Sequence, residues 1–266
     1  MSQSPRDRAA QQPGPTTLPP RPMLLERDEY VPKGAAEEFI VPLLNRWVKE
    51  AIVRWGDRVS SPLRCLDVGC GRQPFRKVIE QVGLRYIGLD AVQNPEGTVD
   101  LVCEIDRPLP AELEERHFEL IICTEVLEHV ADWSSAWENL ARLLAPGGHL
   151  IVTCPHFYML HEEPYDFWRP TLNALRWFAE ANGLSAVELS PGGDRWAILG
   201  TFLGAVSERP ARAGITARAA AGMVGRVRRM VFSVLRHGWI QRFVALDGRM
   251  YLSSLAVFTK PATTSG

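Results

Sequence analysis

Two glycines and two aspartates in the first half of the chain have the spacing of a nucleotide-binding site. Apolar residues around Asp67 predict a buried strand, and Gly69 and Gly71 follow in a turn where backbone can lie against a ligand. A second apolar run ends at Asp90, 19 residues beyond Gly71. A carboxylate at that separation can accept hydrogen bonds from both hydroxyls of a ribose. The two elements therefore predict a site for a nucleotide-type cofactor.

The residues around this turn favour S-adenosylmethionine over NAD. A dinucleotide site needs a third glycine so that a helix N-terminus can close on the pyrophosphate, whereas this chain has Gln73 and Pro74 there. Asp67 is poorly placed beside a pyrophosphate but suits the cationic amino-acid end of S-adenosylmethionine. An NAD-binding module is the second interpretation.

Residues 155–170 concentrate groups that could take up a proton, together with several aromatic side chains. Histidine titrates near neutral pH, so His161 and His156 are the candidate general bases for a hydroxyl acceptor. Glu162 or Asp166 would orient the base. A buried hydrogen-bond network that fixes the loop is the structural alternative. A divalent metal held by His156, His161 and Glu162 has no recognised ligand spacing, so no metal site is predicted.

The elements that must position these residues alternate between strands and helices. After the first two strands, further strands are predicted at residues 100–104, 120–124, 149–154, 186–189 and 252–259, with helices at 133–144 and 171–182. This alternation is typical of an α/β protein with a parallel sheet covered on both faces. Ligands bind such sheets at the carboxyl ends of the strands, so the turn after Asp67, Asp90 and residues 124–126 should meet in one pocket.

Four stretches occur in the order of one known family: residues 66–71 (LDVGCG), 86–90 (YIGLD), 118–130 (FELIICTEVLEHV) and 143–152 (LLAPGGHLIV). Over residues 63–189 the chain resembles the class I S-adenosylmethionine-dependent methyltransferases, specifically the type 11 methyltransferase domain. It departs from many members at Arg72 and Gln73, where they have another glycine.

The resemblance implies a Rossmann-like, doubly wound, mostly parallel seven-stranded sheet, with a helical insertion before a last strand that enters antiparallel at the sheet edge. It also implies adenine contacts near residues 104–106 and a methyltransferase activity. The residues expected to bind S-adenosylmethionine are Asp67, Gly69, Cys70, Gly71, Asp90, Ala91, Glu104, Ile105, Thr124, Glu125 and Val126.

Glu125, Glu128 and His129 fall within one turn of helix and invite a metal interpretation. A metalloprotease site needs two histidines four residues apart with a glutamate between them, and this segment has one histidine. The resemblance explains the segment as a loop and short helix that wall the cofactor pocket. Catalysis by His129 is the minor alternative.

Composition divides the chain into five segments. Residues 1–22 contain six prolines and predict a disordered tail, and residues 23–62 predict a helical segment interrupted near Pro42. Residues 63–190 form the predicted cofactor-binding core, residues 191–250 a helical, arginine-rich insertion or cap, and residues 251–266 the last strand and tail. The tail lacks the apolar run of a secretory signal, and no run of 18 apolar residues occurs, so a cytoplasmic protein is expected.

The insertion has a distinct charge pattern. Residues 209–242 carry eight arginines and no acidic residue, with apolar residues at near-helical spacing. A basic amphipathic helix of this kind can make peripheral contact with an anionic membrane. The competing interpretation is a lid helix that docks its apolar stripe on the domain and turns its arginines to solvent.

The overall composition excludes several other classes. A formal net charge of -1 gives no reason to expect a nucleic-acid partner. The five cysteines are scattered singly, which favours buried reduced thiols over a zinc site or disulfides. We therefore expect methyl transfer to a hydroxyl of a small molecule or glycan precursor, a substrate class that rests on the resemblance alone. An N- or C-methyltransferase, or a non-catalytic module that binds S-adenosylmethionine or S-adenosylhomocysteine, would share the same cofactor motifs.

Overall fold

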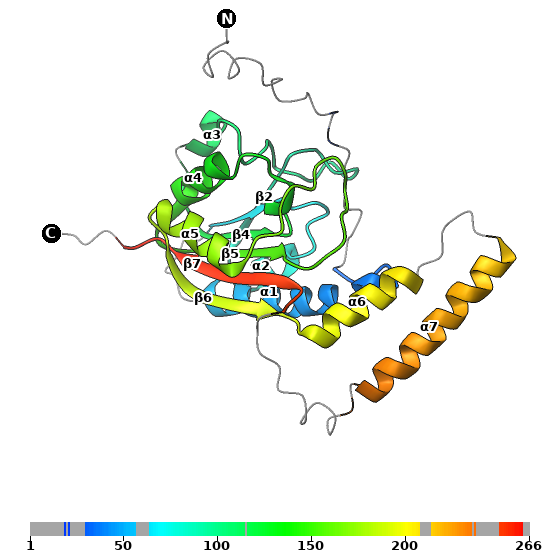
Figure 1. Cartoon of the computed structure of the whole chain (residues 1–266). Coiled ribbons are helices and arrows are strands. Elements are labelled where there is room, and N and C mark those ends of the chain that lie inside the picture. Colours follow the sequence, from blue (N-terminus) through cyan, green and yellow to red (C-terminus); the bar gives the residue numbers. More distant parts are fainter. Residues whose placement is uncertain are drawn as a thin grey trace, which may run out of the picture.

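The computed structural model describes Pro19, Arg21, His237 and residues 30–56, 64–114, 116–207, 214–235 and 250–262. They contain a seven-stranded sheet in the order β3-β2-β1-β4-β5-β7-β6 (Figure 1). β7 is antiparallel to both of its neighbours, and the other pairs are parallel. The predicted Rossmann-like α/β fold is confirmed. The strands are β1 (Arg64–Val68), β2 (Arg85–Asp90), β3 (Leu101–Val102), β4 (Phe118–Thr124), β5 (Leu144–Pro155), β6 (Ser185–Gly192) and β7 (Ser253–Thr259).

Helices cover both faces of the sheet because the central strands are apolar on both sides. In β1, Leu66 and Val68 pack into the cluster beneath α4 (Trp133–Leu143) and α5 (Leu172–Ala181), together with Leu113 of α3 (Ala111–Glu114). The alternate residue Cys65 packs against α1 (Ile40–Gly56) and α2 (Arg76–Gln81). Side-chain caps fix where two helices begin, since Asp132 accepts from the Ser135 N–H and Thr171 from the Ala174 N–H.

The last strand does not lie at the sheet edge, so that expectation is wrong. β7 lies between β5 and β6, and Val257 pairs with Ile151 on one side and Glu188 on the other. The physical reason is burial. Leu255, Ala256, Val257 and Phe258 are at most 3% exposed, and an edge position would leave this apolar run without a partner on one side.

Two local predictions also need correction. Pro42 does not interrupt the N-terminal helix, because it lies in the first turn of α1, where its missing N–H has no partner to lose. β3 has two residues rather than the five predicted, and the chain leaves the sheet at Cys103 to form the loop that carries Glu104.

The insertion forms two helices, α6 (Arg195–Ser207) and α7 (Ile215–Leu235), as Figure 1 shows beyond the sheet. Residues 208–213, 236 and 238–249 of the insertion lie outside the described residues, as does the predicted tail apart from Pro19 and Arg21. The N-terminal segment consists of the short helix η2 (Ala35–Glu37) followed by α1. None of the described helices combines the length and apolarity needed to cross a membrane.

Candidate active site

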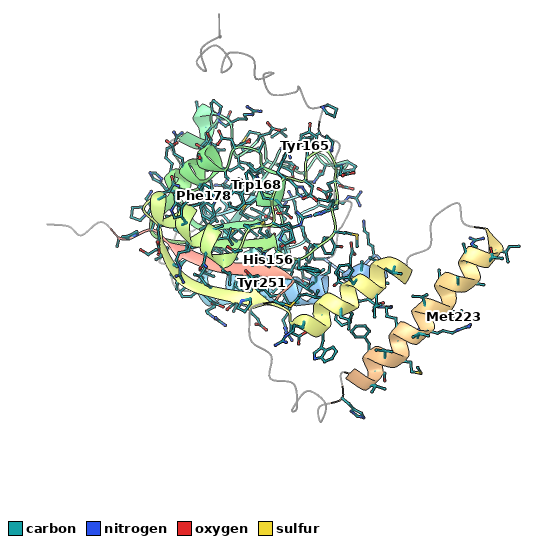
Figure 2. The ribbon with its side chains drawn as sticks, in the orientation of Figure 1. His156, Tyr165, Trp168, Phe178, Met223 and Tyr251 are labelled. Atoms are coloured by element: carbon teal, nitrogen blue, oxygen red, sulfur yellow. The ribbon has the colours of Figure 1, made fainter. Side chains whose placement is uncertain are left out.

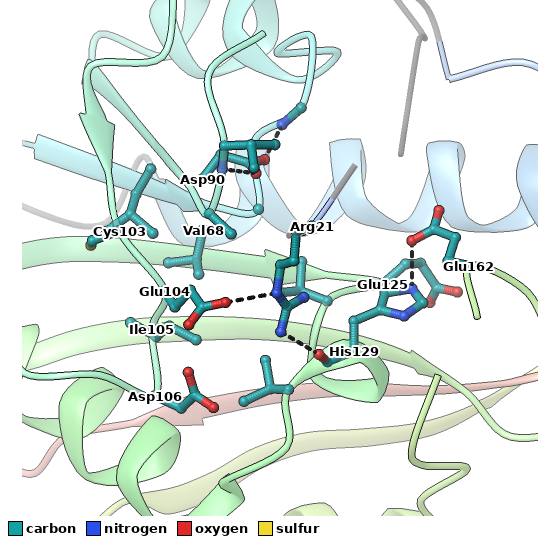
Figure 3. A pocket seen from close by; sticks show the side chains of 17 residues that line it. Arg21, Val68, Asp90, Cys103, Glu104, Ile105, Asp106, Glu125, His129 and Glu162 are labelled. Atoms are coloured by element: carbon teal, nitrogen blue, oxygen red, sulfur yellow. Dashed lines mark hydrogen bonds and ion pairs between the residues drawn. The ribbon is translucent and has the colours of Figure 1, made fainter. Parts of the chain in front are cut away.

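A cleft opens at the carboxyl ends of β1, β2 and β4, and Figure 3 shows its lining side chains. Its floor is the turn after β1, where Gly69 and Gly71 have φ of 69° and 50°. This left-handed region favours glycine. A Cβ on Gly69 would lie 2.2 Å from Cγ2 of Val126.

Asp90 ends β2 and faces this cleft. One carboxylate oxygen accepts from the Gly71 N–H at 2.9 Å, and the other accepts from the Val92 N–H at 3.2 Å. The backbone thereby fixes the carboxylate and braces the glycine turn. Each oxygen keeps a further lone pair, which a ribose hydroxyl could use.

A smaller pocket continues the cleft beyond the glycine turn and is lined by Asp67, Thr124 and Tyr30. Asp67 is 2% exposed and accepts a 2.7 Å hydrogen bond from the Tyr86 hydroxyl. Burial raises the pKa of Asp67 to about 7, although the Tyr86 hydrogen bond lowers it in part. A cationic ligand at this end would favour the ionised carboxylate. Tyr30 brings the N-terminal segment to the pocket, a role that the sequence left open.

The opposite end of the cleft is lined by Glu104, Ile105 and Asp106. Arg21 reaches this end, as Figure 3 shows: its Nε lies 2.8 Å from Glu104 Oε1, and its Nη2 donates to the His129 carbonyl at 2.9 Å. Its guanidinium carbon lies 4.4 Å from the centre of the Tyr165 ring. The sequence places Arg21 in a tail without structure, whereas the structure gives it defined contacts inside the cleft.

The residues predicted to bind the cofactor all line these two pockets. They meet because each lies near the carboxyl end of one of the parallel strands or in the loop or turn that follows it. The cleft is lined by Gly69, Gly71, Asp90, Ala91, Glu104, Ile105, Glu125 and Val126, and the smaller pocket adds Asp67, Cys70 and Thr124.

Two buried glutamates form the wall after β4. Burial raises the pKa of Glu125 to about 7, while a hydrogen bond from the Ser253 hydroxyl at 3.3 Å lowers it in part. Burial and the nearby charge of Glu125 raise the pKa of Glu128 well above its ordinary value. Glu125 also has φ of 54°, an uncommon conformation for a residue other than glycine and one that clusters at functional sites.

His129 lies in the short helix η3 (Leu127–His129) and lines the cleft. Its Nδ1 is 2.9 Å from the Tyr165 carbonyl oxygen, which only accepts, so Nδ1 carries the proton. Nε2 faces Glu162 Oε2 at 3.1 Å, so a proton taken up there would be held between ring and carboxylate. Burial lowers the pKa of His129 to about 4, against the effect of the Tyr165 hydrogen bond, and the ring is neutral near pH 7.

His161 lies edge-on to His129, with ring centroids 4.9 Å apart. Its Nδ1 is 3.3 Å from Asp166 Oδ2, and its backbone N–H donates to the same carboxylate at 2.8 Å. Arg169 holds Asp166 through contacts of 2.5 and 2.6 Å. Burial acts to raise the pKa of Asp166, but the hydrogen bonds from Arg169 keep it below its ordinary value. Asp166 therefore orients His161, and burial lowers the pKa of the His161 ring.

His156 lies apart from this cluster. Its ring stacks on Tyr251 at 4.4 Å, and its Nδ1 is 3.2 Å from the Pro170 carbonyl oxygen. Figure 2 shows His156 beside Tyr251. The two histidines predicted as bases are thus separated, and His161 meets His129 instead.

Three ligand atoms from Glu128, His129 and His161 lie within 4.8 Å of one another and could hold a metal ion. The sequence predicts no such set. Of the two trios that the sequence offered, one included His156, which the fold places against Tyr251. The other shares Glu128 and His129 with the structural set but has Glu125 in place of His161. The structural set forms only because the loop after β5 folds back over η3, a long-range event that local spacing does not encode.

The comparisons with known proteins agree with this geometry. The pattern of a family described as "Methyltransferase domain" matches residues 44–189, more than half of the chain. The chain belongs to this methyltransferase family. Its activity is S-adenosylmethionine-dependent methyl transfer, and the cleft fits that cofactor. The glycine floor admits close approach, Asp90 faces the cleft, and the buried Asp67 suits a cationic end.

The relatives agree on methylation at modest identity. A protein named ubiquinone biosynthesis O-methyltransferase from Nitrobacter winogradskyi is 26% identical over 65% of this chain and 81% of its own length. The protein of that name from Dechloromonas aromatica is 31% identical over 43% of this chain, which spans about half (51%) of that relative. Among solved structures, the [4+2]-cyclase SpnF gives a TM-score of 0.53 at 18% identity, covering 82% of this chain and 81% of SpnF. That likeness shows the fold alone.

Proposed function

We propose that the protein methylates a hydroxyl group of a small molecule or glycan precursor. The observation that carries the proposal is the position of a candidate base, His129, which lines the cleft with its Nε2 3.1 Å from Glu162 Oε2. Removal of a hydroxyl proton needs such a base, whereas a neutral amine acceptor does not. The names of the O-methyltransferase relatives support the same acceptor class.

In this proposal the residues divide the work along the cleft. S-adenosylmethionine, when bound, supplies an electrophilic methyl group. Asp90 holds the ribose, Glu104 and Ile105 border the adenine, and Asp67 meets the amino-acid end. These residues would hold the cofactor in the cleft. The acceptor must therefore approach from the wall that η3 and the loop after β5 form.

The acceptor proton would move to Nε2 of His129 as the oxygen–methyl bond forms and the sulfur–methyl bond of the bound cofactor breaks, with S-adenosylhomocysteine as the leaving group. The resulting imidazolium lies between the Tyr165 carbonyl and Glu162, which both stabilise its protons. The role of base thus passes from His161, the first candidate from sequence, to His129, because His129 lines the cleft. His161 is then a positioning residue that packs on His129 and is itself oriented by Asp166.

The test measures release of S-adenosylhomocysteine with a panel of phenols, sugar alcohols and amines. With a hydroxyl acceptor, His129→Ala should lower kcat by about 10²- to 10⁴-fold and leave S-adenosylmethionine affinity nearly unchanged. His156→Ala is the matched control and should keep most of the turnover, because its ring lies on Tyr251. Near-normal turnover of His129→Ala would refute the base assignment. Transfer to amines alone would refute the hydroxyl proposal.

A further inference from the structure

α7 docks on the rest of the protein through one face only. On that face, Arg228 forms a two-pronged ion pair with Glu38, with contacts of 2.8 and 2.9 Å. One turn further, the buried Phe232 packs on Phe39 with ring centroids 5.1 Å apart. The lid interpretation from the sequence describes this helix only in part: Arg218, Arg226 and Arg229 face solvent, but Arg228 docks.

The apolar stripe of α7 faces outward instead. Met223, Val227, Met230 and Val234 follow one another at spacings of four, three and four residues, which places them on one side of a helix. Their exposed fractions are 62, 50, 64 and 53%, so no described part of the chain covers them. Figure 2 shows Met223 on the outer side of α7. Arg228 and Phe232 lie on the opposite side of the helical wheel.

The charge of α7 indicates which kind of surface could cover its apolar stripe. Its charged residues are four arginines, of which Arg218, Arg226 and Arg229 are exposed. Arg226 borders the apolar stripe, whereas Arg218 and Arg229 lie on the polar side of the helix. The sequence has no acidic residue between Glu208 and Asp247. A second copy of α7 would bring arginine against arginine, which disfavours a symmetric dimer through this face. An anionic lipid surface instead matches the apolar stripe, the adjacent Arg226 and the net positive charge of the helix.

We propose that α7 docks the protein in the plane of an anionic membrane surface, with Met223, Val227, Met230 and Val234 entering the headgroup region. At 21 residues α7 is about 31 Å long, or nearly six turns, and the stripe from Met223 to Val234 covers about three of them. α6 connects this surface to the acceptor loop, because Phe202 packs on Phe157 with ring centroids 5.3 Å apart. The proposal concerns location and does not depend on which acceptor is methylated.

The experiment is co-sedimentation of the full-length protein with vesicles of phosphatidylcholine alone or mixed with phosphatidylglycerol, at low and high salt. Binding should require phosphatidylglycerol and weaken as salt rises. Changing Arg218, Arg226 and Arg229 together to glutamate should weaken binding by about 100-fold or more. The matched control changes Lys77, Arg85 and Arg176 to glutamate, which gives the same net charge at exposed sites on other elements. The control should keep most of the affinity.

A second pair of substitutions, Met223→Ser with Met230→Ser, tests the apolar stripe without altering charge. It should weaken binding by about 10-fold or more, and circular dichroism checks that α7 stays helical. Failure of the wild-type protein to bind phosphatidylglycerol vesicles at low salt would overturn the proposal. Equal loss in the charge control, or unchanged binding by the serine variant, would also overturn it. A lipid-free dimer that the serine variant abolishes would assign the stripe to a second copy instead.

Discussion

Asp67→Asn is expected to stabilise the cofactor-free protein above pH 7 while weakening its affinity for S-adenosylmethionine. Asp67 is 2% exposed, and burial raises its pKa from 3.8 to about 7. Ionising this carboxyl in the folded protein therefore costs free energy that the unfolded chain does not pay. Asparagine removes that cost and can still accept the hydrogen bond from Tyr86.

The magnitude follows from the shift in pKa. About three units correspond to about 4 kcal/mol once the pH exceeds 7. Between pH 4 and 7 the folded protein binds more protons at Asp67 than the unfolded chain, so this residue makes stability fall as pH rises through that window. Between pH 5 and 8 the wild-type protein should lose about 3 kcal/mol that Asp67→Asn keeps.

The assay is denaturant unfolding of both proteins at pH 5 and pH 8, compared as a difference between wild type and variant. That difference cancels the other groups that titrate, including Glu125 and His129. Glu112→Gln, at an exposed site, is the control and should show no such pH-dependent difference. Parallel stabilities of wild type and Asp67→Asn at the two pH values would refute the buried-charge argument.

Calorimetry at pH 8 tests the second half of the prediction. Loss of the charge facing a cationic ligand end should weaken S-adenosylmethionine binding by about 10- to 100-fold. The wild-type affinity should also fall as pH drops below 7, because Asp67 then binds a proton that competes with the ligand. A variant with wild-type affinity and the same pH dependence would show that Asp67 does not meet the amino-acid end.

Two further predictions concern the cofactor cleft. Asp90→Asn keeps an acceptor for the Gly71 N–H but loses the charge, whereas Asp90→Ala loses both. Calorimetry should therefore show the highest S-adenosylmethionine affinity for the wild type, a lower one for Asp90→Asn and the lowest for Asp90→Ala. The alanine variant should lose about 1.5 to 3 kcal/mol of binding free energy. Equal affinities of the three proteins would show that Asp90 does not bind the ribose. Gly69→Ala should lower the free energy of unfolding and abolish cofactor binding, because its Cβ would lie 2.2 Å from Val126 and its φ is 69°. Gly147→Ala shares the positive φ, at 78°, but meets nothing within 4 Å, so it should lose only about 1 to 2 kcal/mol. Equal losses in the two glycine variants would show that the contact with Val126 does not matter.

The sequence by itself determined the sheet and its cofactor edge, because the signals for both are local. The apolar run ending at Asp67, the glycine turn and the run ending at Asp90 each specify a strand and the turn that follows it. Parallel strands then bring their carboxyl ends to one edge, so Thr124 could be assigned to the pocket without coordinates. Glu104 was assigned there through the family resemblance.

Only the tertiary structure decided the features that depend on pairing between distant segments. β7 lies inside the sheet because both of its faces and both of its edges find partners there. Arg21 enters the cleft through Glu104, and His161 reaches His129 because the loop after β5 folds back. The exposed side of α7 likewise follows from long-range contacts on its other side, Arg228 with Glu38 and Phe232 with Phe39. Periodicity predicted that α7 is amphipathic, but which side docks depends on a carboxylate 190 residues away in the chain, which local spacing does not reveal.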